Sequence, residues 1–170
     1  MPGLNKRVFL SLGGNLGDPE QSMAAALVAL DAHASVQVVN VSSLYRTRPW
    51  GRLDQPDFLN AAAELSTVLQ PLPFLKLCLE TERKLKRVRQ ERWGPRLIDI
   101  DILMFDDCII QEAGLEIPHP RMLERAFVLA PLAELAPDLD TGGKPVSQRL
   151  AKMDISGVER LDSGRNWWRN

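Results

Sequence analysis

Residues 97–105 read LIDIDILMF and form the clearest strand pattern of the chain. Side chains alternate between the two faces of a strand, so the isoleucines at 98, 100 and 102 point one way, while Asp99 and Asp101 point the other. The rise of a strand places the two carboxylates about 6.6 Å apart along that face. Two anions on an apolar strand repel each other and resist burial, and a shared cation such as Mg²⁺, which prefers oxygen ligands, offsets both effects. The alternative is a solvated edge face with two ordinary aspartates.

A cluster of basic residues precedes this strand. It comprises Arg83, Lys84, Lys86, Arg87, Arg89, Arg92 and Arg96. Arg92 and Arg96 flank a tight Trp93-Gly94-Pro95 turn next to the predicted metal site, and guanidinium groups bind phosphate oxygens in bidentate fashion. Basic residues in the last turn of a helix also favour its dipole while they stay solvated, and we prefer this interpretation for Lys84 and Lys86.

Length and composition limit the class of protein. The chain has 170 residues, of which 45% are hydrophobic and 25% are charged, which is typical of one globular domain spanning residues 1–170. Its apolar runs are too short to span a bilayer, and no signal-peptide pattern opens the chain, so we expect a cytoplasmic protein without a membrane partner. Cys78 and Cys108 make no disulfide framework. A net charge of −1 with one basic cluster suits a compact polyanion better than a nucleic acid.

The pattern along the chain mixes helices and strands. Asp18 is suited to cap a helix with Pro19 at its first position and Gln21 completing a capping box. We expect strands at 7–12, 36–45, 58–69 and 97–105, and helices at 19–34, 71–88 and 122–135, with the 36–45 strand buried on both faces. A turn at Asp106-Asp107 predicts a hairpin that leads into residues 108–110. The class is therefore α+β with a largely antiparallel sheet.

Two further segments carry possible chemistry. His119 lies between Pro118 and Pro120 in a stiff segment, where it could donate a hydrogen bond to phosphate, although a turn histidine without a role explains it equally well. The glycine-rich loop at 13–17 follows a strand like a phosphate cradle, but it matches neither common phosphate-binding motif. Its glycines also suit a tight turn or a close approach to a ligand.

Five segments together resemble the hydroxymethyl-dihydropterin pyrophosphokinase family of the folate pathway. They are SLGGNLG at 11–17, SLYRT at 43–47, DQPDFLNA at 54–61, RWGPRLIDID at 92–101 and IPHP at 117–120. The run at 92–101 is highly specific. The resemblance covers residues 8–139 in family order, while residues 141–170 form a C-terminal extension in which Trp167-Trp168 has no family explanation.

This resemblance implies transfer of pyrophosphate from ATP to 6-hydroxymethyl-7,8-dihydropterin, with AMP as the other product. It implies a single-domain αβα sandwich with a ferredoxin-like core and a monomer that binds no nucleic acid. Asp99 and Asp101 would hold two Mg²⁺ ions against the triphosphate. Departures from the family occur at Arg48, Trp50 and Pro120, and in an arginine loop that is one residue shorter than in some members.

The resemblance also assigns roles to residues. The catalytic positions are Arg87, Arg96, Asp99, Asp101 and His119. The pterin would lie between Phe58 and Phe127, and the other pterin-binding positions are Thr47, Pro49, Trp50, Asn60 and Trp93. The nucleotide-binding positions are Glu82, Arg89, Arg92, Arg96, Ile102, His119 and Arg125, with Glu82 on either the nucleotide or the pterin side. Without the resemblance, Phe58 and Phe127 suit an ordinary core.

Two other functions fit parts of the pattern. A magnesium-dependent nucleotidyltransferase also places two aspartates at this spacing on a strand, but it would release pyrophosphate instead of AMP. An RNA-binding module would use the basic residues between 83 and 96, and its binding would depend steeply on salt.

Overall fold

A computed structural model describes residues 5–49, 54–86 and 97–169. Within these residues, four strands form an antiparallel ferredoxin-like core in the order β5-β1-β4-β2. The strands are β1 (Lys6–Gly14), β2 (Val36–Val41), β4 (Phe58–Thr67) and β5 (Asp99–Phe105). The same sheet continues past β4 through the short strands β3 (Tyr45–Thr47) and β8 (Val158–Arg160). The expected antiparallel α+β class is confirmed.

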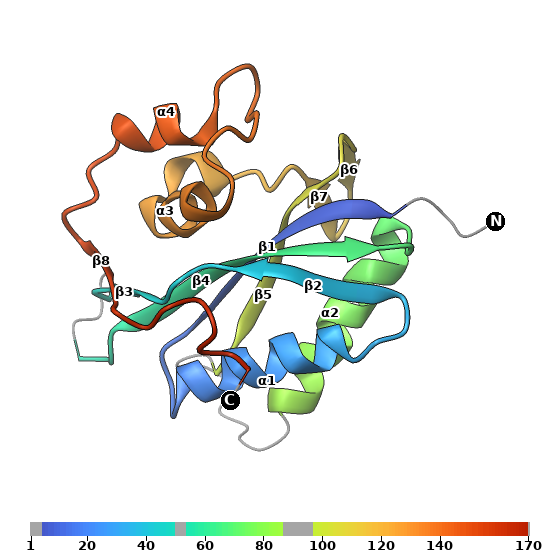
Figure 1. Cartoon of the computed structure of the whole chain (residues 1–170), viewed down its shortest axis with the longest axis horizontal. Coiled ribbons are helices and arrows are strands. Elements are labelled where there is room, and N and C mark those ends of the chain that lie inside the picture. Colours follow the sequence, from blue (N-terminus) through green and yellow to red (C-terminus); the bar gives the residue numbers. More distant parts are fainter. Residues whose placement is uncertain (1–4, 50–53, 87–96, 170) are drawn as a thin grey trace.

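Helices cover both faces of the sheet (Figure 1). One face carries α1 (Pro19–Asp31) and α2 (Pro71–Lys86), and the other carries α3 (Ala126–Leu135) and α4 (Val146–Ala151). The start of α1 follows the expected capping, since the Asp18 carboxylate accepts a 3.1 Å hydrogen bond from the Gln21 N–H and Pro19 opens the helix. Pro131 lies inside α3 without ending it. The three layers match the expected αβα sandwich.

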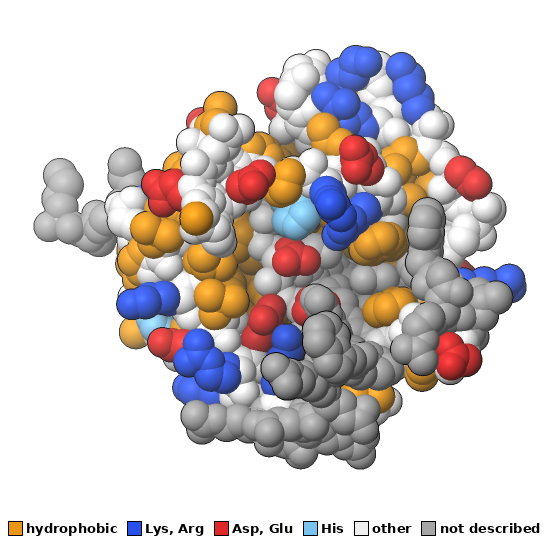
Figure 2. Space-filling view, turned by 180° about the vertical axis from the view of Figure 1, so that it is seen from behind, with side chains coloured by type: hydrophobic (Ala, Val, Ile, Leu, Met, Phe, Trp, Pro, Cys, Tyr) orange, Lys and Arg blue, Asp and Glu red, His pale blue; other side chains and the backbone are white. Residues whose placement is uncertain are grey.

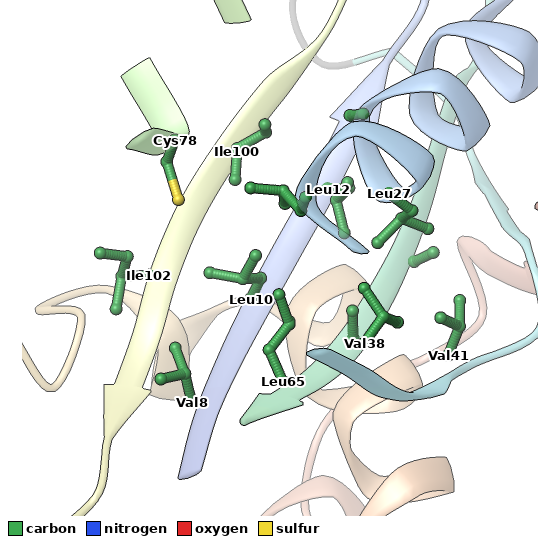
Figure 3. Packing of buried hydrophobic residues seen from close by; sticks show 14 of the residues in the cluster. Val8, Leu10, Leu12, Leu27, Val38, Val41, Leu65, Cys78, Ile100 and Ile102 are labelled. Carbon is green, nitrogen blue, oxygen red and sulfur yellow. The ribbon is translucent and has the colours of Figure 1, made fainter. Parts of the chain in front are cut away.

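The alternation of side chains creates two hydrophobic cores. Figure 3 shows the core under α1 and α2, where Leu10, Leu65 and Ile100 come from three adjacent strands. The opposite core contains Phe9, Leu103 and residues of α3. The isoleucine face of β5 is therefore buried as expected, and the aspartate face points toward the α3 side.

Two expectations about strands are wrong. Residues 108–110 do not pair back onto β5, because β6 (Ile110–Glu112) pairs with β7 (Leu115–Ile117) in a separate two-stranded sheet. The strand predicted at 36–45 stops at Val41, and it is not buried on both faces, since Val39 is 51% exposed. Val39 lies at a β-bulge, where the pairing register with β4 shifts between Val38 and Asn40. The exposure itself follows from alternation, because Gln37 on the same face of β2 is also exposed while Val36 and Val38 are buried.

On the side of the molecule drawn in Figure 2, patches of acidic and of basic side chains are scattered among hydrophobic and uncharged ones. This mixture agrees with the net charge of −1. No helix in the described part of the chain is both long enough and apolar enough to cross a membrane.

Candidate functional site

Three neighbouring strands align the central residues of the site. Asp99 of β5 pairs with Gly13 of β1, and Gly13 pairs on its other side with Asn60 of β4. Adjacent strands are about 5 Å apart, so the backbones of Asp99 and Asn60 lie about 10 Å from each other across the glycine. Residues directly opposite in a sheet point to the same face. The expected metal-binding and pterin-binding residues therefore share one face.

The same register adds further residues to this face. Asp101 lies two positions along β5 from Asp99, and Phe58 lies two positions along β4 from Asn60. Thr47 pairs with Phe58 across β3 and β4. The face is the one covered by α3. Phe58 is half-buried and belongs to neither hydrophobic core as far as the described residues go, which leaves its ring suited to contact a ligand.

Gly13 sets the position of the Asn60 side chain. A Cβ atom at Gly13 would lie 2.7 Å from the Asn60 Oδ1 atom, well inside van der Waals contact. The Asn60 Nδ2 group donates a 3.3 Å hydrogen bond to the Thr47 Oγ1 atom, and both side chains are buried. The close approach thus decides between the interpretations of the glycine loop at this position, because Gly13 makes room for a polar side chain.

Asp99 and Asp101 offer carboxylate oxygens on one face of an edge strand. The described residues contain no group of three or more His, Cys, Asp or Glu side chains that could hold a metal ion. Among the described residues, Asp99 and Asp101 would thus be the candidate ligands, and a substrate or water could complete the coordination of a cation. Mg²⁺ is bound in this way, by one or two carboxylates together with substrate phosphates, so the residues present fit Mg²⁺.

Helix α2 adds two charged residues to this site. The Glu82 Oε1 atom accepts a 2.6 Å hydrogen bond from the Ile100 N–H on the free edge of β5. The Lys86 Nζ atom lies 3.7 Å from the Glu82 carboxylate and 3.8 Å from the Asp99 carboxylate. Burial raises the pKa of Glu82, and the Ile100 hydrogen bond and Lys86 oppose this. Lys86 lies in the last turn of α2 and is 40% exposed, as expected, and it also lies near both carboxylates.

His119 also lies beside β5, where its backbone is hydrogen-bonded to that strand. Its backbone N–H donates a 2.9 Å hydrogen bond to the Leu103 carbonyl, and its ring Nδ1 atom accepts one from the Arg121 N–H at 3.2 Å. A neutral ring that accepts at Nδ1 carries its proton on Nε2. Burial lowers the pKa of His119, and the nearby charge of Asp101 opposes this effect. The ring is therefore neutral near pH 7 and can donate through Nε2.

The remaining described residues of the predicted site are Arg125, Phe127, Ile102 and Pro49. The Arg125 guanidinium lies over the Phe127 ring, 5.7 Å from its centroid, at the start of α3. The two side chains predicted to serve different substrates are thus in contact. Ile102 is buried in the core under α1 and α2, so any contact with a nucleotide would use its backbone. Pro49 follows β3 and is partly exposed.

Several predicted site residues lie outside the described part of the chain. They are Trp50, Arg87, Arg89, Arg92, Trp93 and Arg96.

Residues 9–137 match the sequence profile of the 7,8-dihydro-6-hydroxymethylpterin-pyrophosphokinase (HPPK) family. The chain belongs to this family. A relative from Methylorubrum extorquens, named 2-amino-4-hydroxy-6-hydroxymethyldihydropteridine pyrophosphokinase, is 49% identical over 156 residues, which cover 92% of this chain and 99% of the relative. A protein of the same name from Pseudomonas aeruginosa is 43% identical over 157 residues, which cover 92% and 97%. The resemblance based on the five sequence segments is confirmed.

Solved structures of Plasmodium falciparum HPPK-DHPS share the fold. One gives a TM-score of 0.76 at 17% identity and covers 93% of this chain and 49% of that chain. The wild-type form gives a TM-score of 0.73 at 15% identity and covers 92% and 48%. This chain therefore spans slightly under half the length of those proteins, and the likeness supports the αβα fold of an HPPK.

Sequence reasoning named Glu82 and Asn60 through the family resemblance, but it missed their contacts with β5 and with Gly13, and it missed Lys86 and Glu134. The i,i+4 spacing of Glu82 and Lys86 indicates a helix pair, but only the tertiary structure brings that pair to Asp99. The contact between Gly13 and Asn60 depends on strand register, which the sequence patterns do not specify. Glu134 of α3 also lies at the edge of this region, and no sequence pattern singled it out.

Proposed function

We propose that this chain transfers the pyrophosphoryl group of ATP to 6-hydroxymethyl-7,8-dihydropterin, as a step of folate biosynthesis. The hydroxymethyl oxygen forms a bond to the β-phosphorus of ATP, and the bond from this phosphorus to the oxygen bridging the α- and β-phosphates breaks. AMP leaves with that oxygen, and the hydroxyl proton passes to solvent or a phosphate oxygen. Family membership and the names of the relatives support this reaction.

One observation carries the proposal. In the row Asp99–Gly13–Asn60, the proposed metal ligand Asp99 and the proposed pterin-binding Asn60 share one face of the sheet, separated by a residue without a side chain. A pterin whose ring edge meets Asn60 can direct its hydroxymethyl group along the glycine toward Asp99. Reactions of this kind depend chiefly on positioning, because phosphoryl transfer requires the attacking and leaving oxygens to be in line.

Residues of the pterin half act by shape and hydrogen bonding. The Phe58 ring supplies a stacking face for a planar heterocycle, and Phe127 supplies the second. Asn60 and Thr47 have amide and hydroxyl groups for the pterin edge, and both are held by their mutual hydrogen bond. The backbone near Pro49 is proposed to line the pterin pocket beyond Thr47. Buried directional groups of this type discriminate strongly against ligands that lack the matching donors and acceptors.

Residues of the phosphate half act by charge. We propose that Asp99 and Asp101 would bind two Mg²⁺ ions. These ions would neutralise negative charge on the triphosphate. Lys86 adds a positive charge near Asp99 and Glu82. His119 donates a hydrogen bond from Nε2 to a phosphate oxygen, and Arg125 contributes positive charge nearby. Arg87, Arg89, Arg92 and Arg96 stay predicted phosphate contacts, and Trp50 and Trp93 stay predicted pterin contacts.

The test is a product analysis. The protein is incubated with ATP, Mg²⁺ and 6-hydroxymethyl-7,8-dihydropterin, and the expected products are AMP and the pterin diphosphate. Release of pyrophosphate together with a nucleotidylated product would support the nucleotidyltransferase instead. Salt-sensitive RNA binding without Mg²⁺, and no AMP, would support the RNA-binding module.

The wider properties of the chain are part of the same proposal. We propose that residues 1–170 act as one domain and one monomer, located in the cytoplasm, with ATP and the pterin as small-molecule partners and with no nucleic-acid or membrane partner. Size-exclusion chromatography coupled to light scattering tests the monomer directly.

A further inference from the structure

The carboxylate of Glu134 joins three parts of the chain that lie far apart in sequence. It lies near the end of α3, and its side chain is only 7% exposed. Its Oε1 atom accepts a 2.7 Å hydrogen bond from the Tyr45 hydroxyl, and its Oε2 atom accepts one from the Ser43 N–H at 3.0 Å. Oε2 also accepts a 2.8 Å hydrogen bond from the Arg165 Nε atom. One buried carboxylate therefore connects α3, the entry to β3 and the C-terminal extension.

The C-terminal extension binds the same short segment, residues 42–47, along its backbone. Strand β8 pairs with β3, and the Leu161 N–H donates a 2.8 Å hydrogen bond to the Leu44 carbonyl. The Leu44 N–H in turn donates to the Ser163 hydroxyl at 3.0 Å. The indole N–H of Trp167 donates a 2.8 Å hydrogen bond to the Ser42 carbonyl. The extension is thus a strap that runs along residues 42–47 (Figure 1).

This strap includes the two tryptophans that the family resemblance leaves unexplained. Trp167 and Trp168 are 6% and 4% exposed and belong to the core under α1 and α2. A buried tryptophan combines a large apolar contact with one directed hydrogen bond, so it fixes both the position and the orientation of what it touches. Trp167 directs its hydrogen bond at Ser42, at the start of the strapped segment.

The strapped segment leads directly into the proposed pterin pocket. Tyr45 pairs with Asn60 across β3 and β4, and the Thr47 hydroxyl accepts the hydrogen bond of the Asn60 amide. We propose that Glu134 and Trp167 are positioning residues for pterin binding, because they fix residues 42–47 and so set where Thr47 and Asn60 lie. This inference rests on the proposed function for its ligand. Small displacements of positioning groups are enough to weaken recognition strongly.

Two variants with matched controls test the inference. Glu134→Gln keeps the shape of the side chain but removes its charge and replaces one accepting oxygen by an NH₂ group. Trp167→Phe removes the indole N–H. The control Glu64→Gln removes a similar ion pair. A Glu64 carboxylate oxygen of β4 lies 3.1 Å from the Arg7 Nε atom, and the Glu64 side chain is 17% exposed. The control Trp168→Phe changes the neighbouring buried tryptophan, whose indole has no hydrogen bond to residues 42–47 in the described structure.

The measurements are the calorimetric Kd for 6-hydroxymethylpterin, the Kd for the magnesium complex of a non-hydrolysable ATP analogue, and the thermal midpoint. We expect the pterin Kd to rise about 10-fold in Glu134→Gln and about 3- to 5-fold in Trp167→Phe, as for loss of one buried hydrogen bond. The nucleotide Kd should stay within about 2-fold in both variants, and both controls should keep the pterin Kd of the original chain.

The outcomes separate positioning from general stability. A pterin Kd that is the same in each variant as in its control, or an equal loss of affinity for both ligands, would overturn the inference. If the original chain binds no pterin, the proposed function fails, and hydrogen exchange in the ligand-free protein then decides. Faster exchange of the Thr47 and Asn60 amides in Glu134→Gln but not in Glu64→Gln supports positioning, and unchanged exchange overturns it.

Discussion

At the scale of single residues, Gly13 illustrates how an absent side chain contributes to a site. The Asn60 Oδ1 atom occupies the space in which a Cβ atom at position 13 would lie. The strands on either side carry Asp99 and Asn60, so any side chain at Gly13 would stand between the two proposed substrate positions. The neighbour that would have to yield is the end of one side chain rather than backbone, which predicts a local effect.

Gly13→Ala should therefore weaken pterin binding with little loss of stability. We expect the pterin Kd to rise about 10- to 100-fold, since the Asn60 amide must turn away from its hydrogen bond with Thr47. The free energy of unfolding should fall by only about 1–2 kcal/mol, the cost of the displaced Asn60–Thr47 hydrogen bond. Calorimetry and urea unfolding measure the two quantities. An unchanged pterin Kd would show that Asn60, in its present position, does not contact the pterin.

Asp99→Asn and Asp101→Asn should each lower turnover by about 10²- to 10³-fold while leaving the fold intact, because each removes a charge that would bind Mg²⁺. Steady-state AMP production at saturating Mg²⁺ measures this loss, and circular dichroism checks the fold. Asp107→Asn, a change at an exposed turn just after β5, is the matched control and should keep normal turnover. Near-normal turnover in either active-site variant would remove that residue from the metal site.

The sequence predicted some of these residues and not others for physical reasons. The Asp99 and Asp101 pair was predictable because strand alternation puts them on one face regardless of tertiary structure. The proximity of Lys86 to Asp99 was not predictable because it depends on where the end of α2 meets β5. Phe58 and Asn60 entered through the family motif alone, since an aromatic residue and an amide near a strand start have no distinctive periodicity.

At the scale of elements, one side chain of α2 makes a direct hydrogen bond to the backbone of β5, in addition to the apolar packing of Phe74 against Phe105. Strand β5 is at the edge of the sheet, so its outer N–H groups lack a neighbouring strand. Glu82 of α2 accepts the hydrogen bond of one of them, that of Ile100, and this backbone group lies between the two aspartates. The helix therefore holds the strand that carries the proposed metal ligands.

Glu82→Ala should destabilise the protein by about 1–3 kcal/mol, because it leaves the Ile100 N–H without its partner, whereas Glu82→Gln keeps an acceptor and should cost about 1 kcal/mol or less. Urea unfolding measures both. Glu80→Ala, at an exposed position of the same helix, should change stability by about 0.5 kcal/mol at most. If Glu82→Ala is as stable as Glu80→Ala, the hydrogen bond to β5 contributes nothing measurable.

Elements were predictable where the local pattern was strong, and were mispredicted where pairing partners decided the outcome. Strands β1, β4 and β5 follow from alternation, and α1 follows from its cap. The hairpin after β5 was mispredicted because the residues that follow the turn at Asp106-Asp107 pair with β7 instead of β5. Residues 110–112 pair with residues 115–117 through a turn at Gly114. This second turn offered another hairpin in the same stretch of sequence.

At the scale of the whole molecule, Glu134 makes stability depend on pH. Burial alone would raise the pKa of Glu134, but hydrogen bonds from Tyr45, Ser43 and Arg165 lower it, and the net direction is down. A carboxyl group whose pKa is lower in the folded state stabilises that state at pH values above its ordinary value of 4.5. This stabilisation is lost as pH falls through the folded-state pKa.

The difference in unfolding free energy between the original chain and Glu134→Gln should therefore depend on pH. We expect about 1–3 kcal/mol at pH 7, as for hydrogen bonds to a charged group, and a difference that shrinks toward zero as the pH falls below 4.5. Urea unfolding at pH 7, 5 and 3.5 measures it, and the other carboxyl groups cancel because both proteins share them. A difference that is constant over this range would mean that the charge of Glu134 does not stabilise the fold.

The hydrogen bond from Trp167 to Ser42 spans 125 positions in the chain, and this separation has a consequence for biosynthesis. The ribosome releases a chain from its N-terminus, so residues 42–47 emerge long before the strap that completes them. Strands β1, β4 and β5 can pair first, and the aspartate face is then assembled while the segment that ends at Thr47 still lacks its last partners. Loop closure over such a span is slow compared with local contacts. The phosphate half of the site should thus form early on the nascent chain. The pterin half should form only after the strap that contains Trp167 has been translated.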